Sequence, residues 1–166
     1  MTAEKVCCFT GHRVIPEEDY KPLFMILDKL INNCLDAGYT TFRVGGAMGF
    51  DMEVEELLLR KRHEEGRSLR LELVLPCRDQ ADRWSFDNKR RYKRILREAD
   101  SIEYICDRYE DGCMQKRNRV MVDGSAMCIS YCTRTRSGTY GTIRYAKQQG
   151  LQHIELSKYL SAVPHT

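Results

Sequence analysis

The sequence lacks long apolar runs and a strong imbalance of charge, and each absence excludes a class of protein. No apolar run is long enough for a membrane span. The opening residues, MTAEKVCCFTGHR, place charges ahead of any apolar run, so no signal peptide is predicted and we expect a cytoplasmic protein. The formal net charge of +3 is too small to indicate nucleic-acid binding by itself.

Cysteine pairs at metal-ligand spacing are also missing. The chain has eight cysteines and four histidines, but it has no CxxC pair, and no histidine lies at zinc-ligand spacing from a cysteine pair. We therefore predict no metal site. Without a secretion signal, the cysteines are expected to be reduced thiols, with Cys7, Cys8, Cys128 and Cys132 in strand-like runs of the core.

The sequence has instead a regular alternation of strand-like and helix-like segments. Its 166 residues, 42% of them hydrophobic, fit one domain with a sizeable core, and no repeat or linker divides them. Strands are predicted at 5–10, 40–44, 69–75, 101–105, 126–132 and 153–156, and helices at 18–37, 52–65, 81–98, 114–122 and 143–149. This order predicts an α/β fold, a three-layer, doubly wound, mostly parallel sheet with helices on both faces.

Three candidate ligand-binding loops follow strands of this predicted sheet: TGHR at 10–13, GGAMGFD at 45–51 and RTRSGTYGT at 134–142. Ligands of open α/β sheets bind beyond the carboxyl ends of the strands. Glycine lets the backbone approach a ligand closely, and a following helix start offers unpaired N–H groups, so these loops favour a phosphate-bearing ligand. The chain has neither a GxGxxG nor a GxxxxGK[ST] motif. The alternative interpretation is that the glycines only permit tight turns from strand to helix.

Four segments together resemble the SLOG superfamily and, within it, the YpsA-like group. They are TGHR, GGAMGFD, MQKRNRVMVD at 114–123 and SGTYGTIRYA at 137–146, and Trp84 lies in the third crossover as it does in YpsA-like proteins. The resemblance covers about residues 5 to 150. It implies one Rossmann-like SLOG-type domain over residues 1–166, related to the DprA and LOG branches, with a pocket for nucleotides or nucleotide-derived signals.

The residues predicted to bind the ligand come from the loops and from this resemblance. Arg13 and Arg117 are expected to supply positive charge, although solvated surface arginines are common. His12 lies where a general acid or base could act, although loop histidines more often serve as hydrogen-bonding partners. The full set is Thr10, Gly11, His12, Arg13, Gly45, Gly46, Gly49, Asp51, Arg117, Asn118, Ser137, Gly138, Thr139 and Thr142.

One departure from the LOG branch bears on catalysis. LOG relatives are phosphoribohydrolases with a PGGxGTxxE motif, but here the segment reads SGTYGTIRY and Tyr145 stands in place of the glutamate. Cleaving an N-glycosidic bond needs a carboxylate, and a tyrosine is neutral at pH 7. The candidate catalytic residues are therefore Asp51 and Arg117, with Asp123 a weaker candidate; Asp51 also suits a helix start for its dipole alone.

Three functions remain open at this point. The first is binding or sensing of a nucleotide-derived small molecule, and the second is a nucleotide-processing hydrolase of the N-glycosidase or phosphoribohydrolase type. The third, weakest, is single-stranded nucleic-acid binding, because the basic run from Lys89 to Arg97 has Trp84, Phe86 and Tyr92 interleaved with it. No cofactor is predicted beyond the nucleotide-like ligand, and a homodimer is plausible.

Overall fold

A computed structural model of the chain describes residues 5–160. The strands are β1 (Val6–Gly11), β2 (Thr41–Val44), β3 (Arg70–Leu75), β4 (Ser101–Tyr104), β5 (Met127–Tyr131) and β6 (Gln152–Glu155). The helices are α1 (Glu17–Asp36), α2 (Phe50–Glu64), α3 (Phe86–Glu98), α4 (Cys113–Val122), α5 (Gly138–Gln148) and α6 (Ser157–Leu160).

The strands form one sheet in the order β4-β3-β2-β1-β5-β6. Every neighbouring pair in it is parallel. From β1 the chain steps outward through β2, β3 and β4, then returns to the other side of β1 for β5 and β6. The order therefore reverses between β1 and β5, whose register sets Phe9 beside Ile129 and Thr10 beside Ser130. The predicted α/β, Rossmann-like fold is confirmed, with a sheet that is parallel throughout residues 5–160.

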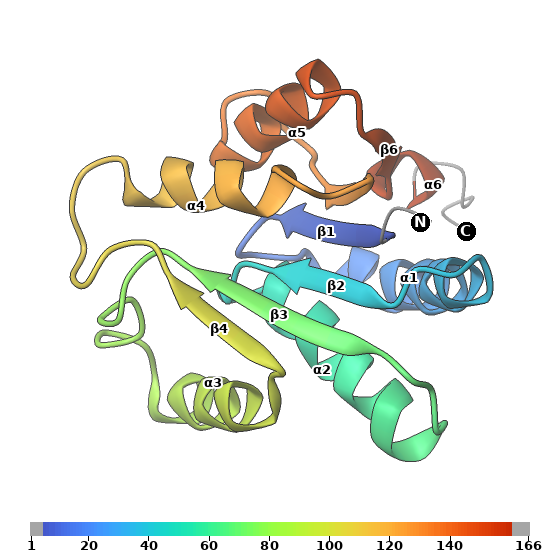
Figure 1. Cartoon of the computed structure of the whole chain (residues 1–166), viewed down its shortest axis with the longest axis horizontal. Coiled ribbons are helices and arrows are strands. Elements are labelled where there is room, and N and C mark those ends of the chain that lie inside the picture. Colours follow the sequence, from blue (N-terminus) through green and yellow to red (C-terminus); the bar gives the residue numbers. More distant parts are fainter. Residues whose placement is uncertain (1–4, 161–166) are drawn as a thin grey trace.

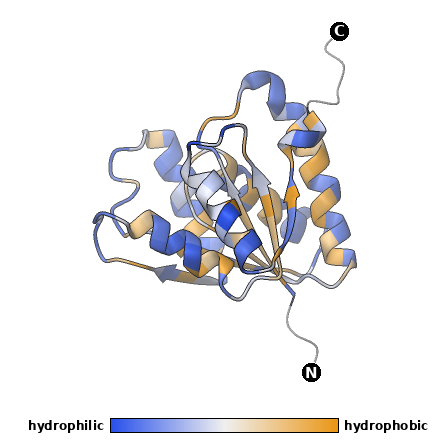
Figure 2. Cartoon of the chain, turned by 90° about the horizontal axis from the view of Figure 1, so that it is seen from above, coloured by the Kyte–Doolittle hydropathy of each residue, from blue (hydrophilic) through white to orange (hydrophobic). Residues whose placement is uncertain are grey.

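Helices cover both faces of the sheet (Figure 1). The larger core lies between the sheet and α1, α2 and α3, where Leu23, Leu27 and Ile31 of α1 share one cluster with Phe9 and Phe42. A smaller core lies under α4 and α5; it contains Cys8, Val74, Met121, Val122, Cys128 and Ala146. Figure 2 shows hydrophobic residues along the central strands, and helices around them on which hydrophobic and hydrophilic residues alternate. Within residues 5–160, no helix has the length and apolar character needed to span a bilayer.

Strand position in the sheet explains the burial of each strand. All five residues of β5 are buried, as are the first five of β1, because both strands are covered on both faces. In edge strand β4, Ile102 and Glu103 are exposed, and Ser101 and Tyr104 are partly buried. All eight cysteines lie within the described residues and are free thiols, six of them buried; Cys106 and Cys132 are partly exposed.

Two helices start several residues away from the position that the sequence predicts. The helix expected from 81 begins at Phe86, because the Ser85 side chain caps it by accepting a hydrogen bond from the Asn88 N–H at 3.2 Å. The helix expected from 143 begins at Gly138, and the Ser137 side chain accepts from the Tyr140 N–H at 3.1 Å. The second glycine-rich segment is therefore mostly the first turns of α5, since a serine cap compensates for the poor helix propensity of glycine.

Two glycines let the loops after β1 and β2 pack against each other. A Cβ on Gly11 would lie 2.3 Å from the ring of Phe50, the first residue of α2. Gly49 has φ +77°, and a Cβ there would lie 2.1 Å from the carbonyl oxygen of Arg13. The His12 carbonyl then accepts from the Phe50 N–H at 3.1 Å, so the start of α2 is attached directly to the loop after β1.

We expect Gly49→Ala to destabilise the protein more than Gly66→Ala. Both glycines have positive φ, but a Cβ on Gly66 would meet no atom within 4 Å. Gly66→Ala should therefore cost only the backbone strain, about 1 kcal/mol, and Gly49→Ala a further amount of about 1–3 kcal/mol for the overlap. Urea unfolding of the two variants measures the difference, and equal losses would show that the Gly49 contact with Arg13 is unimportant.

Candidate functional site

A cleft of about 550 Å³ opens where the strand order reverses, at the carboxyl ends of β1 and β5. This is the place at which doubly wound sheets bind ligands, because the loops after the two central strands diverge to opposite faces. Ten of the residues predicted from sequence line it: Thr10, Gly11, His12, Arg13, Asp51, Arg117, Asn118, Ser137, Gly138 and Thr139.

Four predicted residues lie outside this lining. Gly45, Gly46 and Gly49 do not line the cleft, and close packing accounts for each glycine. A Cβ on Gly45 would lie 2.7 Å from the Arg117 guanidinium, and one on Gly46 would lie 2.2 Å from Leu75. For these three, the tight-turn interpretation explains the geometry, and contact with a ligand stays a prediction. Thr142 lies one turn into α5 and lines an adjoining groove instead.

Part of the lining is not among the site residues predicted from the sequence. Ala47, Met114, Gln115, Met121 and Thr133 border the cleft together with Val14, Pro16 and Arg134. Gln115 is three residues before Asn118 on α4, so helical spacing alone could have indicated that both face the same way. Thr133 and Arg134 follow β5 after Cys132, and their position just beyond a central strand was the available signal.

Asp51 is the buried acid of the cleft. It is the second residue of α2, is only 5% exposed, and its Oδ2 accepts from the Ala47 N–H at 3.2 Å. Its Oδ1 is buried without a hydrogen-bond partner. Burial raises the pKa of Asp51 to about 6, although the nearby charge of Arg117 acts in the opposite direction. The carboxyl group can therefore gain or lose a proton near neutral pH.

Arg117 reaches from α4 to the loop after β2. Its Nη1 donates to the Gly45 carbonyl, and its Nε donates to Asn118 Oδ1 at 2.7 Å. The side chain is 6% exposed, and burial lowers its pKa while the neighbouring Asp51 raises it. Arg117 therefore braces the turn at Gly45 and places a positive charge beside the Asp51 carboxyl group.

Glu55 is a buried acid that is not among the site residues predicted from the sequence. It lies one helical turn after Asp51, is 1% exposed, and neither carboxyl oxygen has a hydrogen-bond partner. Burial raises the pKa of Glu55 well above its ordinary value, and the nearby Asp51 charge raises it further. Burial therefore disfavours a second negative charge beside Asp51.

His12 connects the two central loops. Its Nε2 accepts a hydrogen bond from the Thr133 N–H at 2.9 Å, and its ring packs edge-on against Tyr131 with centroids 5.9 Å apart. Burial lowers the pKa of His12, and the positive charge of Arg134 lowers it further. The neutral imidazole therefore acts as an acceptor that fixes the loop after β5 against the loop after β1.

The charge of the cleft favours an anion. Its charged lining residues are three arginines (Arg13, Arg117 and Arg134) and one acid, Asp51. Among the described residues, no carboxylate lies within ion-pair distance of Arg13 or Arg134. The start of α5, which has no acid in its first turn, also borders the cleft and adds the positive end of its dipole.

Tyr145 does not face the cleft. Its hydroxyl donates to Asp123 Oδ1 at 2.6 Å at the far end of α4, and this hydrogen bond raises the pKa of Tyr145. Neither Tyr145 nor Asp123 is among the residues that line the cleft. Asp51 is thus the one acid among the cleft residues that the structure describes. No group of three or more metal-ligating side chains lies within residues 5–160.

A comparison with family models identifies the chain. The YpsA model, described as the YspA SLOG family, matches residues 15–161. The chain belongs to this family. This SLOG protein is 32% identical to an uncharacterised SPbeta prophage-derived protein, YoqJ, of Bacillus subtilis strain 168. The match covers 68% of the present chain and 72% of YoqJ. The present chain is 29% identical to a UPF0398 protein of Bacillus pumilus over 58% of its own length and 53% of that protein.

The SLOG chain also shares its fold with DNA processing protein A. The structure from Helicobacter pylori, described as having a unique single-stranded DNA binding mode, matches with a TM-score of 0.66 and 18% identity over 92% of this chain and 65% of that chain. The structure from Streptococcus pneumoniae matches with a TM-score of 0.61 and 14% identity, and the match covers 98% of this chain and 63% of that chain. The present chain thus spans less than two thirds of either one.

We expect His12 to contribute a loss of stability as the pH falls through about 6.5, and His12→Gln to remove that contribution. Because the pKa of His12 is lowered on folding, the unfolded chain binds a proton that the folded chain refuses, and stability is complete only above the unfolded pKa. Glutamine keeps an acceptor for the Thr133 N–H without titrating. Urea unfolding at pH 8 and pH 5 measures the difference.

The matched control is His63→Gln, at a half-exposed histidine of α2. A pH dependence that His12→Gln and His63→Gln change equally would contradict the role given to His12.

Proposed function

We propose that the cleft binds a nucleotide or nucleotide-derived small molecule, with the protein acting as a ligand-binding or sensor domain. One observation carries the proposal: three features line the same cleft, at the point where the strand order reverses. They are Arg13 and Arg134, which have no acidic partner, the start of α5, and Asp51, whose Oδ1 has no hydrogen-bond partner. Positive charge suits phosphate, and a lone carboxylate oxygen suits a ribose hydroxyl. Membership of the SLOG family supports the same ligand class.

Within this proposal the parts of the cleft have different tasks. Arg13 and Arg134, which both line the cleft, hold the phosphate together with the start of α5. Arg13 is exposed, and its Nη2 lies 3.2 Å from the sulfur of Met114, a weak acceptor that a phosphate oxygen readily replaces. Asp51 Oδ1 accepts from a sugar hydroxyl, and Arg117 keeps that carboxyl group charged. His12 holds the two loops in register.

We expect nucleotides to raise the melting temperature of the protein and Arg13→Gln to weaken their binding about tenfold, because one charge-assisted hydrogen bond is lost. The measurement is a thermal-shift screen of nucleoside monophosphates, NAD⁺ and ADP-ribose, followed by calorimetric titration. Arg83→Gln, which removes an exposed arginine away from the cleft, is the control and should leave affinity unchanged. The absence of binding to every member of the panel would remove the proposal.

A hydrolase remains the second candidate, and the pKa of Asp51 favours it. A cleft carboxyl group whose pKa is raised to about 6 can serve as a general acid or base at neutral pH. We expect, for an N-glycosidase, release of free base from nucleoside monophosphates, and a loss of about 100-fold or more in Asp51→Asn. Chromatography of the products decides this. Activity that survives in Asp51→Asn would exclude Asp51 from the mechanism.

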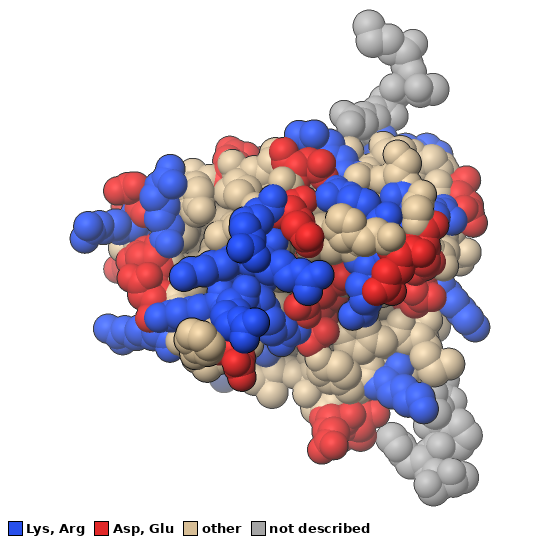
Figure 3. Space-filling model, turned by 90° about the horizontal axis from the view of Figure 1, so that it is seen from below, with Lys and Arg blue, Asp and Glu red and all other residues tan. Residues whose placement is uncertain are grey.

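Single-stranded nucleic acid is the third candidate, favoured by the fold shared with a DNA-binding protein. Basic side chains gather on the face formed by α3 (Figure 3), whose sequence contains Lys89, Arg90, Lys93, Arg94 and Arg97. The aromatic residues there are poorly placed for stacking, because Tyr92 is buried and Trp84 packs edge-on against it at 5.1 Å. Only Phe86, 74% exposed, is open to a base. Oligonucleotide binding that falls steeply with salt, without binding of nucleotides, would favour this candidate.

A further inference from the structure

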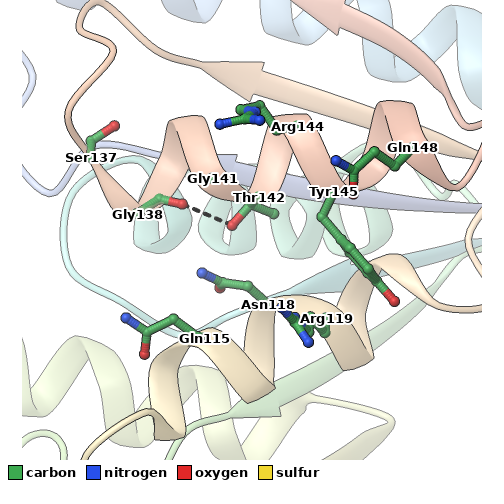
Figure 4. Close-up of a pocket in the computed structure, with 10 residues that line it drawn as sticks. All are labelled: Gln115, Asn118, Arg119, Ser137, Gly138, Gly141, Thr142, Arg144, Tyr145 and Gln148. Carbon is green, nitrogen blue, oxygen red and sulfur yellow. Dashed lines mark hydrogen bonds between the residues drawn. The ribbon is translucent and has the colours of Figure 1, made fainter.

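A second cavity adjoins the cleft on the far side of the start of α5. It is a groove of about 520 Å³ between α4 and α5 (Figure 4). Four residues line both cavities: Gln115, Asn118, Ser137 and Gly138. Both volumes fall within the range of small-molecule sites, roughly 300–1,000 Å³. The start of α5, where the proposed function places the phosphate, therefore lies between two cavities of similar size.

The glycines of α5 leave the groove open. Neither Gly138 nor Gly141 has positive φ, and a Cβ on either would meet no atom within 4 Å. Backbone conformation and packing, which account for Gly11, Gly46 and Gly49, therefore do not account for these two. Glycine inside a helix costs about 1 kcal/mol relative to alanine. Close approach of a ligand to the α5 backbone explains both positions.

The polar groups of the groove suit the edge of a nucleobase. Figure 4 shows Gln115 and Asn118 on α4, facing α5 across the groove. Because Arg117 Nε donates to Asn118 Oδ1, the amide orientation is fixed and the Asn118 NH₂ group is left to donate elsewhere. Gln148 adds a third amide from α5. Amide side chains are the ones that pair with the donor and acceptor pattern of a base.

An aromatic ring and two cations complete the groove. Tyr145 reaches from α5 toward α4, where its hydroxyl is held by Asp123 and the Arg119 guanidinium lies 5.4 Å from its ring centroid. Arg144 lines the groove from α5. Its ten lining residues include no acid. A fixed aromatic ring beside cations is suited to a planar base that carries phosphate.

We propose that the groove between α4 and α5 is the second half-site of a two-ended ligand. Resting on the proposed function, this inference assigns a dinucleotide in which two nucleoside-like halves are joined by a pyrophosphate. The bridging phosphates lie at the start of α5, one half occupies the cleft beside Asp51, and the base of the other half occupies the groove. A mononucleotide fills only one of the two cavities, so a dinucleotide binds more tightly.

The test compares AMP, ADP-ribose and NAD⁺ by calorimetric titration of the wild-type protein and Gly141→Leu. Leucine at 141 projects into the groove, and since its space is open the fold should tolerate it, which circular dichroism checks. We expect NAD⁺ to bind the wild type roughly tenfold or more tightly than AMP. Gly141→Leu should remove this advantage and leave AMP binding unchanged.

The controls are Gly141→Ala, which should retain most of the NAD⁺ affinity, and Gln149→Leu, which adds an exposed leucine at the end of α5 away from the groove. NAD⁺ binding unaffected by Gly141→Leu, or AMP binding as tightly as NAD⁺, would overturn the half-site while the proposed function stands. Failure of the wild type to bind any of the three compounds would instead count against the proposed function itself.

Discussion

Parallel pairing of β1 with β5 is the constraint on which the candidate site depends. Because both strands run in the same direction, their carboxyl ends meet at one edge, and because the chain leaves them for opposite faces, the loops after them separate. The hydrogen bond from the Thr133 N–H to His12 Nε2 fixes this separation. The cleft therefore follows from the topology, and the loops supply its chemistry.

Burial of charge gives the site its second property. Asp51, Glu55 and Arg117 are each at least nine-tenths buried, around the turn at Gly45. Burial penalises the charge of all three groups, and together with the nearby Asp51 charge it raises the pKa of Glu55. Arg117 donates hydrogen bonds to the Gly45 carbonyl and to Asn118 Oδ1, and its charge lowers the pKa of Asp51. The same residue therefore holds the loop in place and affects the protonation of Asp51.

The two glycine-rich segments turned out to differ in kind. Gly46 and Gly49 have positive φ, and a Cβ on either would overlap neighbouring atoms. The fold therefore needs glycine at both positions whether or not a ligand binds. Gly138 and Gly141 have ordinary helical conformation and open space around them. The sequence does not distinguish these two cases, because the atoms that surround each glycine come from distant segments of the chain.

Much of this protein can be read from its sequence. Alternating strands and helices determined the parallel α/β sheet, and residues such as Arg13, Asp51 and Ser137 were predicted to share one edge because each follows a central strand or begins a helix. Tertiary structure alone decided the rest. It buried Glu55 without a partner, turned Tyr145 away from the cleft toward Asp123, and joined the cleft to a groove between α4 and α5. These features arise from contacts between distant segments, which local periodicity does not encode.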